Sequence, residues 1–201
     1  MIYLDYTEDR IKRSAKKVFY EKGLNGARVA EIAKEAEVSK SLLHYYFRTK
    51  EQIFRIVIKD SINLVVNRMV PILTQKLGFY ELIDQFINNI FILFRDNKKL
   101  MLFIITEYNQ NFEKIEFALK PILVFFKEFE YKIQIQSKKE NVIIKYYNHL
   151  ITNIISLCGW HIIGINLLSL DNHINKDIDS STITKIRESI YKNIATLVEK
   201  H

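Results

Sequence analysis

The sequence predicts an all-α fold. The chain of 201 residues has only 5 Gly and 2 Pro, while 48% of its residues are apolar. So few turn-forming residues leave little room for the frequent tight connections of a β-fold. Apolar residues instead recur at the three- and four-residue spacing of amphipathic helices. The length is sufficient to bury a sizeable core in one or two domains.

The first helix is expected over residues 7–22. Ile11, Ala15, Val18 and Phe19 form one apolar stripe along it. Gly23 follows directly, and glycine is the residue that most readily adopts the backbone conformation found at the end of a helix.

Residues 28–50 predict two short helices joined by a tight turn. Val29, Ile32, Ala33 and Ala36 make one apolar face, and Val38 in the following turn is suited to pin the two helices together. Ser39 is expected to cap the second helix, because its hydroxyl accepts from an unpaired backbone N–H.

The second helix of the pair separates an inward from an outward face. Leu43 and Phe47 lie four residues apart and share the inward face. At about 100° per residue, the outward face holds the residues Lys40, Ser41, Leu42, His44 and Tyr45. This face has no carboxylate, and its hydroxyl, imidazole and apolar groups are those that read base edges and the thymine methyl group. The alternative is an amphipathic helical hairpin without a DNA partner.

The rest of the chain predicts further helices, about nine in total. One begins near Lys50 and reaches about Met69, with Ile53, Phe54, Val57 and Ile58 inward, and a break follows at Pro71 and Gly78. The others are expected at 80–95, 98–108, 112–136, 140–170 and 180–200.

Residues 146–170 contain no Asp, Glu, Lys or Arg. The run is long enough to span a bilayer, but its Asn and His residues are costly in lipid. We therefore expect no membrane span, but a helix buried partly within the subunit and partly against a partner. Small residues at Ser156, Gly159 and Gly164 would allow close approach of helices.

Several spaced elements together resemble the N-terminal DNA-binding domain of the TetR family of transcriptional regulators, from about Arg10 to Phe54. The matching features are Ile11 to Phe19, Lys22-Gly23, Ile32-Ala33, Val38-Ser39-Lys40, Leu43-His44-Tyr45-Tyr46-Phe47 and Thr49-Lys50-Glu51. The resemblance implies a domain boundary near residue 50, with a DNA-binding domain at 1–50 and a ligand-binding and dimerisation domain at 51–201. The expected DNA-binding residues are Arg28, Ser39, Lys40, Ser41, Leu42, His44, Tyr45, Tyr46 and Lys50.

Some positions depart from the family's usual pattern. Ala27 and Arg28 stand where the family usually has Thr or Ser, so Asn25 is expected to cap the first helix of the pair. Glu37 replaces a usual Gly, so either Glu37 takes an unfavourable left-handed backbone conformation or the turn differs slightly from that of the family. Ser41 and His44 also differ from the common residues, which leaves the operator sequence open.

The resemblance further implies a homodimer, joined through helices 140–170 and 180–200, on a palindromic operator in double-stranded DNA. It also implies a small-molecule inducer held in the C-terminal bundle. The candidate pocket residues are Phe86, Phe103, Glu107, Tyr108, Asn111, Phe125, Asn153, Trp160 and His161. For the aromatic residues, plain core packing is the alternative.

Charge and composition agree with a cytoplasmic DNA-binding protein. Residues 1–50 hold eleven Lys/Arg against seven Asp/Glu, so +4 of the net charge of +7 lies in the first quarter. Cys158 is the single cysteine, and the N-terminus lacks the pattern of a signal peptide.

No metal-ligand, nucleophile or phosphate-loop motif is present, so we expect neither a cofactor nor an enzyme. The leading hypothesis is a ligand-responsive transcriptional repressor. The alternative is a DNA-binding regulator or structural factor without a small ligand, controlled by a protein partner.

Overall fold

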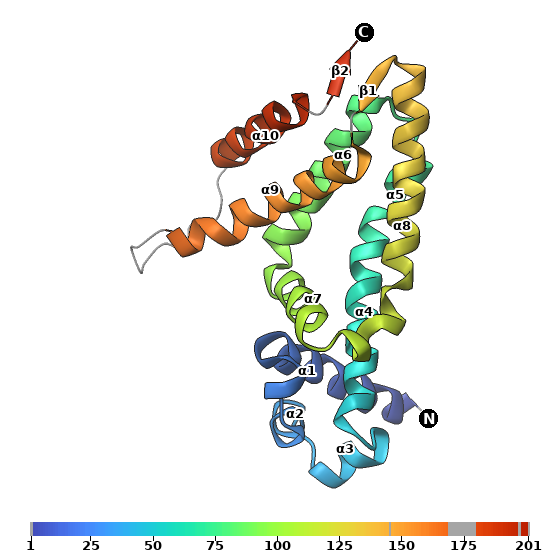
Figure 1. Ribbon diagram of the computed structural model, residues 1–201. Coiled ribbons are helices and arrows are strands. Elements are labelled where there is room, and N and C mark those ends of the chain that lie inside the picture. The colour runs from blue at the N-terminus through green and yellow to red at the C-terminus, as the bar shows by residue number, and fades with distance from the viewer. Residues whose placement is uncertain (1, 145, 169–179, 197, 201) are drawn as a thin grey trace. The chain divides into compact units, whose positions relative to one another are not determined.

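The computed structural model describes residues 2–144, 146–168, 180–196 and 198–200, and these form an all-α fold with one short pair of strands (Figure 1). The elements are α1 (Ile2–Gly26), α2 (Val29–Glu35), α3 (Lys40–Tyr46), α4 (Lys50–Met69), α5 (Pro71–Thr74), α6 (Phe79–Asp96), α7 (Lys98–Gln110), α8 (Phe112–Lys139), β1 (Val142–Ile144), α9 (Tyr147–Leu168), α10 (Ser180–Ala195) and β2 (Val198–Lys200). The predicted fold class is confirmed.

The chain divides into two compact units. The first consists of Met1–Val65 and Lys99–Ile122, and the second of Val66–Lys98 and Leu123–His201. The divisions fall within α4 and α8 rather than in loops, so the helices α4 and α8 each contribute to both units. The functional boundary expected near residue 50 stays a prediction.

The first unit has a core of aliphatic and aromatic side chains from α1, α4 and α7. The predicted stripe of α1 is buried, including Ile11, Ala15 and Phe19. Phe54 of α4 lies edge-on to Phe19, with ring centroids 5.4 Å apart, and to Phe103 at 6.0 Å. Edge-to-face pairs at these distances add to the stabilisation from burial.

In the second unit, α6 supplies the most continuous apolar face. It buries nine side chains, namely Phe79, Leu82, Ile83, Phe86, Ile87, Ile90, Phe91, Leu93 and Phe94. Phe86 stacks on Phe129 of α8 with ring centroids 4.4 Å apart, and Phe125 stacks on Phe129 at 5.6 Å.

Helices α6 and α9 pack against each other within this unit (Figure 1). A Cβ at Gly159 would lie 2.9 Å from Cζ of Phe94, so α9 approaches the aromatic face of α6 through a residue without a side chain. The expectation that Gly159 allows close helix approach is therefore confirmed.

Two expected helix boundaries were wrong. The helix expected at 140–170 begins only at Tyr147, because Asn141 takes a left-handed conformation (φ 54°) that ends α8, and the β-branched run Val142–Ile144 forms β1. The helix expected at 180–200 ends at Ala195, since Val198–Lys200 forms β2, antiparallel to β1.

Within the part of the chain that the structure describes, no helix combines the length and the apolar character needed to cross a bilayer. The charge-free run from residue 146 instead contributes buried residues of α9, among them Leu150, Ile154 and Cys158.

Candidate nucleic-acid interface

Helices α2 and α3 form a helix-turn-helix whose turn is fixed by backbone hydrogen bonds. The N–H of Ala36 donates to the carbonyl of Ile32 at 2.9 Å, and that of Val38 to Ala33 at 3.0 Å. Glu37 between them has a φ of 51°, so of the two alternatives considered for this turn the left-handed conformation is the one observed. Such a conformation costs a residue with a side chain about 1–2 kcal/mol, which the packing on either side must offset.

The beginning of α3 is capped as predicted. Ser39 has an extended backbone, and its Oγ accepts from the N–H of Leu42 at 3.1 Å. Ser39 Oγ also lies 2.9 Å from Oγ of Ser41, so the two hydroxyls form a pair at the start of the helix. Leu43 and Phe47 are buried, with 0% and 2% of their surface exposed, which confirms the inward face.

The outward face of α3 is open to solvent. Lys40, Ser41, Leu42, His44 and Tyr45 are all exposed, as the helical phase predicts. Tyr45 is 74% exposed, the highest value among the large hydrophobic side chains that the structure describes, and Leu42 is 39% exposed. Tyr46 is half-buried, with its ring 5.4 Å from that of Tyr45 in an edge-to-face pair.

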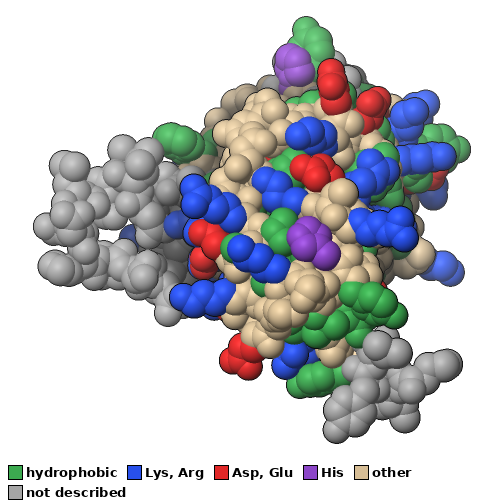
Figure 2. All heavy atoms as spheres, turned by 90° about the horizontal axis from the view of Figure 1, so that it is seen from below, with side chains coloured by type: hydrophobic (Ala, Val, Ile, Leu, Met, Phe, Trp, Pro, Cys, Tyr) green, Lys and Arg blue, Asp and Glu red, His purple; other side chains and the backbone are tan. Residues whose placement is uncertain are grey.

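Figure 2 shows the molecule from below, that is, from the end at which α2 and α3 lie in Figure 1. Lys and Arg side chains gather on this face around a His, with a few carboxylates between them (Figure 2). Arg28, Lys40 and Arg48 are exposed cations of this helix pair and its flanks. The cations of such a surface can bind phosphate oxygens, and these contacts fix the position of a protein on DNA. The groups at its centre can then contact base edges.

The start of α2 differs from the expectation. Its N-cap residue is Arg28, not Asn25, which belongs to the last turn of α1. Glu31, three residues on, accepts from the N–H of Arg28 at 3.3 Å and from Nζ of Lys22 at 2.7 Å. The bond from Lys22 holds the pKa of Glu31 below its ordinary value. An acidic residue three positions after the cap is a readable signal for this role.

Lys50 takes a position that sequence reasoning missed. Its Nζ donates to the carbonyl of Leu24 at 2.7 Å and to that of Ala27 at 3.0 Å, at the carboxyl end of α1. The expected contact of Lys50 with phosphate stays a prediction. Thr49, the preceding residue, caps α4 by accepting from the N–H of Gln52 at 3.1 Å.

The candidate pocket residues divide between the two units. In the first unit, Phe103 lies in the aromatic core and Tyr108 is 51% exposed. Glu107 is fully buried and accepts from the N–H of Leu24 at 2.8 Å and from Nδ2 of Asn111 at 2.7 Å. Here the carboxylate bonds a backbone and an amide group.

In the second unit, Phe86 and Phe125 lie in the stack around Phe129, which is the plain packing considered as their alternative. Asn153 and Trp160 are exposed, Trp160 by 59%. The side chain of His161 lies outside the described residues. A pocket made of these residues stays a prediction.

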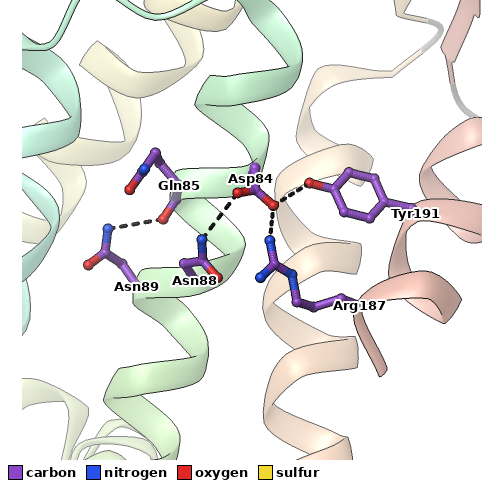
Figure 3. A network of polar contacts seen from close by, with 6 residues as sticks. All are labelled: Asp84, Gln85, Asn88, Asn89, Arg187 and Tyr191. Atoms are coloured by element: carbon purple, nitrogen blue, oxygen red, sulfur yellow. Dashed lines mark hydrogen bonds and ion pairs between the residues drawn. The ribbon is translucent and has the colours of Figure 1, made fainter. Parts of the chain in front are cut away.

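A polar network in the second unit joins α6 to α10 (Figure 3). Asp84 of α6 accepts from Arg187 of α10, from the hydroxyl of Tyr191 at 2.6 Å and from Nδ2 of Asn88 at 3.2 Å. Burial, with the hydrogen bond and charge of Asp84, raises the pKa of Tyr191 to about 12. The adjacent groove, of about 490 Å³, is lined by Leu77, Tyr80, Glu81, Asp84, Gln85 and Tyr191.

A capped helix-turn-helix with an exposed second helix defines the DNA-binding helix-turn-helix regulators as a class. The family described as "Bacterial regulatory proteins, tetR family" matches residues 11–57. The HTH-type transcriptional repressor NicS of Pseudomonas putida is 38% identical over 50 residues, which span 25% of this chain and 24% of NicS. The chain thus matches about a quarter of that relative's length.

Solved structures resemble the chain over nearly all of its length. A Clostridium perfringens protein with the provisional name of fatty acid metabolism regulator has a TM-score of 0.70 at 22% identity, covering 92% of this chain and 96% of that one. The regulator FadR of Bacillus subtilis, solved with stearoyl-CoA, has a TM-score of 0.65 at 21% identity, covering 90% and 96%. These likenesses show the fold. The family match over residues 11–57 identifies a DNA-binding domain of the tetR family of bacterial regulatory proteins.

Proposed function

We propose that this regulator is a homodimer that represses transcription from a palindromic operator and is released by a small, hydrophobic ligand. The observation that carries the proposal is the exposed face of α3, free of carboxylates and capped by Ser39. On this proposal, Ser41, Leu42, His44 and Tyr45 contact base edges in the major groove. Lys40, Tyr46 and Arg28 contact phosphates.

DNA binding is tested with a gel shift on DNA from upstream of the protein's own gene. We expect a complex that weakens with salt and depends on a palindrome. Tyr45→Ala should reduce affinity about tenfold or more, the range expected when one interaction with a base or a phosphate is removed. Tyr131→Ala, at a tyrosine on α8 that is also largely exposed (62%), is the matched control and should bind as the wild type does. Undiminished binding by Tyr45→Ala would contradict the assigned face.

The dimer is proposed to form through α9 and α10. Trp160 supports this, because a tryptophan 59% exposed on a helix without Asp, Glu, Lys or Arg is typical of an interface position. We expect light scattering to give twice the chain mass of 23.9 kDa, and Trp160→Glu to shift the equilibrium toward the monomer. A monomeric wild type would contradict the dimer.

The hydrophobic ligand rests on the likeness to FadR and on the groove beside Tyr80 and Tyr191, whose volume of about 490 Å³ suits a small ligand. Stearoyl-CoA, the molecule named with FadR, is the first probe. We expect it to raise the melting temperature and to dissociate the DNA complex. If neither happens with stearoyl-CoA or with free stearate, this ligand class is excluded.

The alternative is a DNA-binding regulator controlled by a protein partner. It is favoured by the exposed apolar and aromatic residues of α7 and of the start of α8, Leu102, Ile105, Tyr108 and Phe112, since such surfaces often bind other proteins. Release of DNA by a small molecule alone would count against this alternative.

A further inference from the structure

The backbone of Leu24 is held on both sides by side chains from other helices. Its N–H donates to Oε1 of Glu107 at 2.8 Å, and its carbonyl accepts from Nζ of Lys50 at 2.7 Å. Hydrogen bonds to ionised groups are shorter and stronger than those between neutral groups. Both charged partners lie in the first unit, Glu107 on α7 and Lys50 at the first position of α4.

Glu107 reaches the N–H group of Leu24 only because the helix α1 is interrupted at Gly23. Gly23 has φ 65° and ψ −179° within α1, a conformation available essentially to glycine alone. A Cβ there would also lie 2.8 Å from Oε1 of Glu107. The carboxylate is fully buried, and its second oxygen accepts from Asn111. A buried carboxylate is stable only when it is hydrogen-bonded in this way.

Lys50 joins the two ends of the helix-turn-helix. Its ammonium binds the carbonyls of Leu24 and Ala27, just before α2 begins, while Lys50 itself lies a few residues after the end of α3. An ammonium group at the carboxyl end of a helix is also favoured by the helix dipole. The site where the chain enters the DNA-binding pair and the site where it leaves are therefore fixed to each other.

From this geometry we infer that Glu107 and Lys50 are positioning residues for DNA binding. Both residues set the position of α3 through their bonds to the N–H and the carbonyl of Leu24. Because Glu107 lies on α7, the DNA affinity then depends on the position of α7. This role of Lys50 differs from a phosphate contact, since two of its three donors are engaged with the protein's own carbonyls. The inference rests on the proposed function, because it concerns the same DNA complex.

The first test measures the affinity of the full-length chain for a palindrome selected from random DNA by the wild-type protein. Lys50→Met and Glu107→Leu should lower it about tenfold or more. Lys50→Arg and Glu107→Gln keep a donor and an acceptor at these sites and should restore most of the binding. Lys59→Met and Glu113→Leu, at exposed positions on α4 and α8, are the controls.

The salt dependence separates positioning from direct binding of phosphate. If Lys50 bound a phosphate, Lys50→Met would reduce the slope of log affinity against log salt concentration by about one. A positioning residue leaves the slope unchanged while the affinity falls. Hydrogen exchange without DNA gives the second measurement. If the bonds from Lys50 to the carbonyls of Leu24 and Ala27 stabilise the segment between α1 and α2, amides of residues 23–30 exchange faster in Lys50→Met than in the wild type.

The result that would overturn the inference is wild-type affinity in both Lys50→Met and Glu107→Leu, or a slope reduced by about one with unchanged exchange in Lys50→Met. Glu107→Leu leaves a buried N–H unpaired and can unfold the first unit. If that variant unfolds, the inference is decided by Lys50→Met alone, because Lys50 is only half-buried. A wild-type protein that binds no palindrome contradicts the proposed function itself. A wild type that binds, with unaffected variants, contradicts only the inference.

Discussion

Helices α3 and α9 each present an exposed surface, but they are held in place by different means. Helix α3 has seven residues and buries only Leu43. Its surroundings are fixed by hydrogen bonds between backbone groups and the side chains of Ser39, Glu31 and Lys50. Helix α9 has 22 residues and packs along α6 through apolar side chains. A short helix is marginal by itself, so caps and clamps must position it, whereas a long apolar helix is positioned by the core.

The second unit also contains a lysine that holds a short helix by hydrogen bonds to backbone carbonyls. Nζ of Lys132 on α8 donates to the carbonyls of Ile72, Leu73 and Gln75, at the end of the single-turn helix α5. Burial lowers the pKa of this lysine. A lysine at the carboxyl end of a helix thus recurs in both units, which supports the role of polar anchoring beside short helices.

The largest expected effect comes from removing the ring at the centre of the aromatic stack. Phe129→Ala should destabilise the second unit by about 3–5 kcal/mol, because Phe86 and Phe125 both stack on this ring and a cavity remains. Urea denaturation followed by fluorescence of Trp160, the only tryptophan and part of that unit, measures the change. A destabilisation below about 1 kcal/mol would mean that this aromatic stack is not a central part of the core of the second unit.

Next in size is Gly23→Ala, which tests the polar anchoring of the first unit. Strain at φ 65° together with displacement of the Glu107 carboxylate should cost about 2–4 kcal/mol. Thermal melting followed by circular dichroism measures it. Gly26→Ala is the control, since a Cβ there lies 3.3 Å from Cβ of Lys22 only. Equal effects of the two substitutions would contradict the argument that Gly23 makes room for the Glu107 carboxylate.

Gly159→Ala probes the approach of α9 to α6. The added methyl group would lie 2.9 Å from the Phe94 ring, so overpacking should cost about 1–3 kcal/mol. Urea denaturation should show partial recovery when Phe94→Leu is added, because the leucine side chain is smaller. Ser156→Ala, at an exposed position of the same helix, should change the stability by less than about 0.5 kcal/mol.

The smallest effect is expected for Tyr191→Phe, which removes one hydrogen bond to Asp84 and should cost about 0.5–1.5 kcal/mol. The pKa of Tyr191 is raised from 10.0 to about 12, so the folded state favours its neutral form. Its contribution is full below pH 10 and disappears as the pH rises toward 12.

Absorbance at high pH, compared between the wild type and Tyr191→Phe, should show the missing tyrosine to be one that ionises near pH 12. A difference spectrum that emerges at pH 10 instead would show that Tyr191 is not held in the network of Figure 3.

The helices were predictable because their signals are local. The inward positions of Leu43 and Phe47 and the cap at Ser39 follow from spacing and from the chemistry of single residues. The strand pair was missed because β1 and β2 lie far apart in the chain, and three residues give too short a pattern.

The sequence by itself determined the all-α class, the helix-turn-helix and its outward face, since helical period and capping depend on neighbours within a few residues. Only the tertiary structure decided where the charged groups of the core are used. The contacts of Glu107 with Leu24 and of Asp84 with Arg187 join positions 83 and 103 residues apart. Such pairs leave no periodic signal, because the fold that brings them together is set by apolar packing elsewhere in the chain.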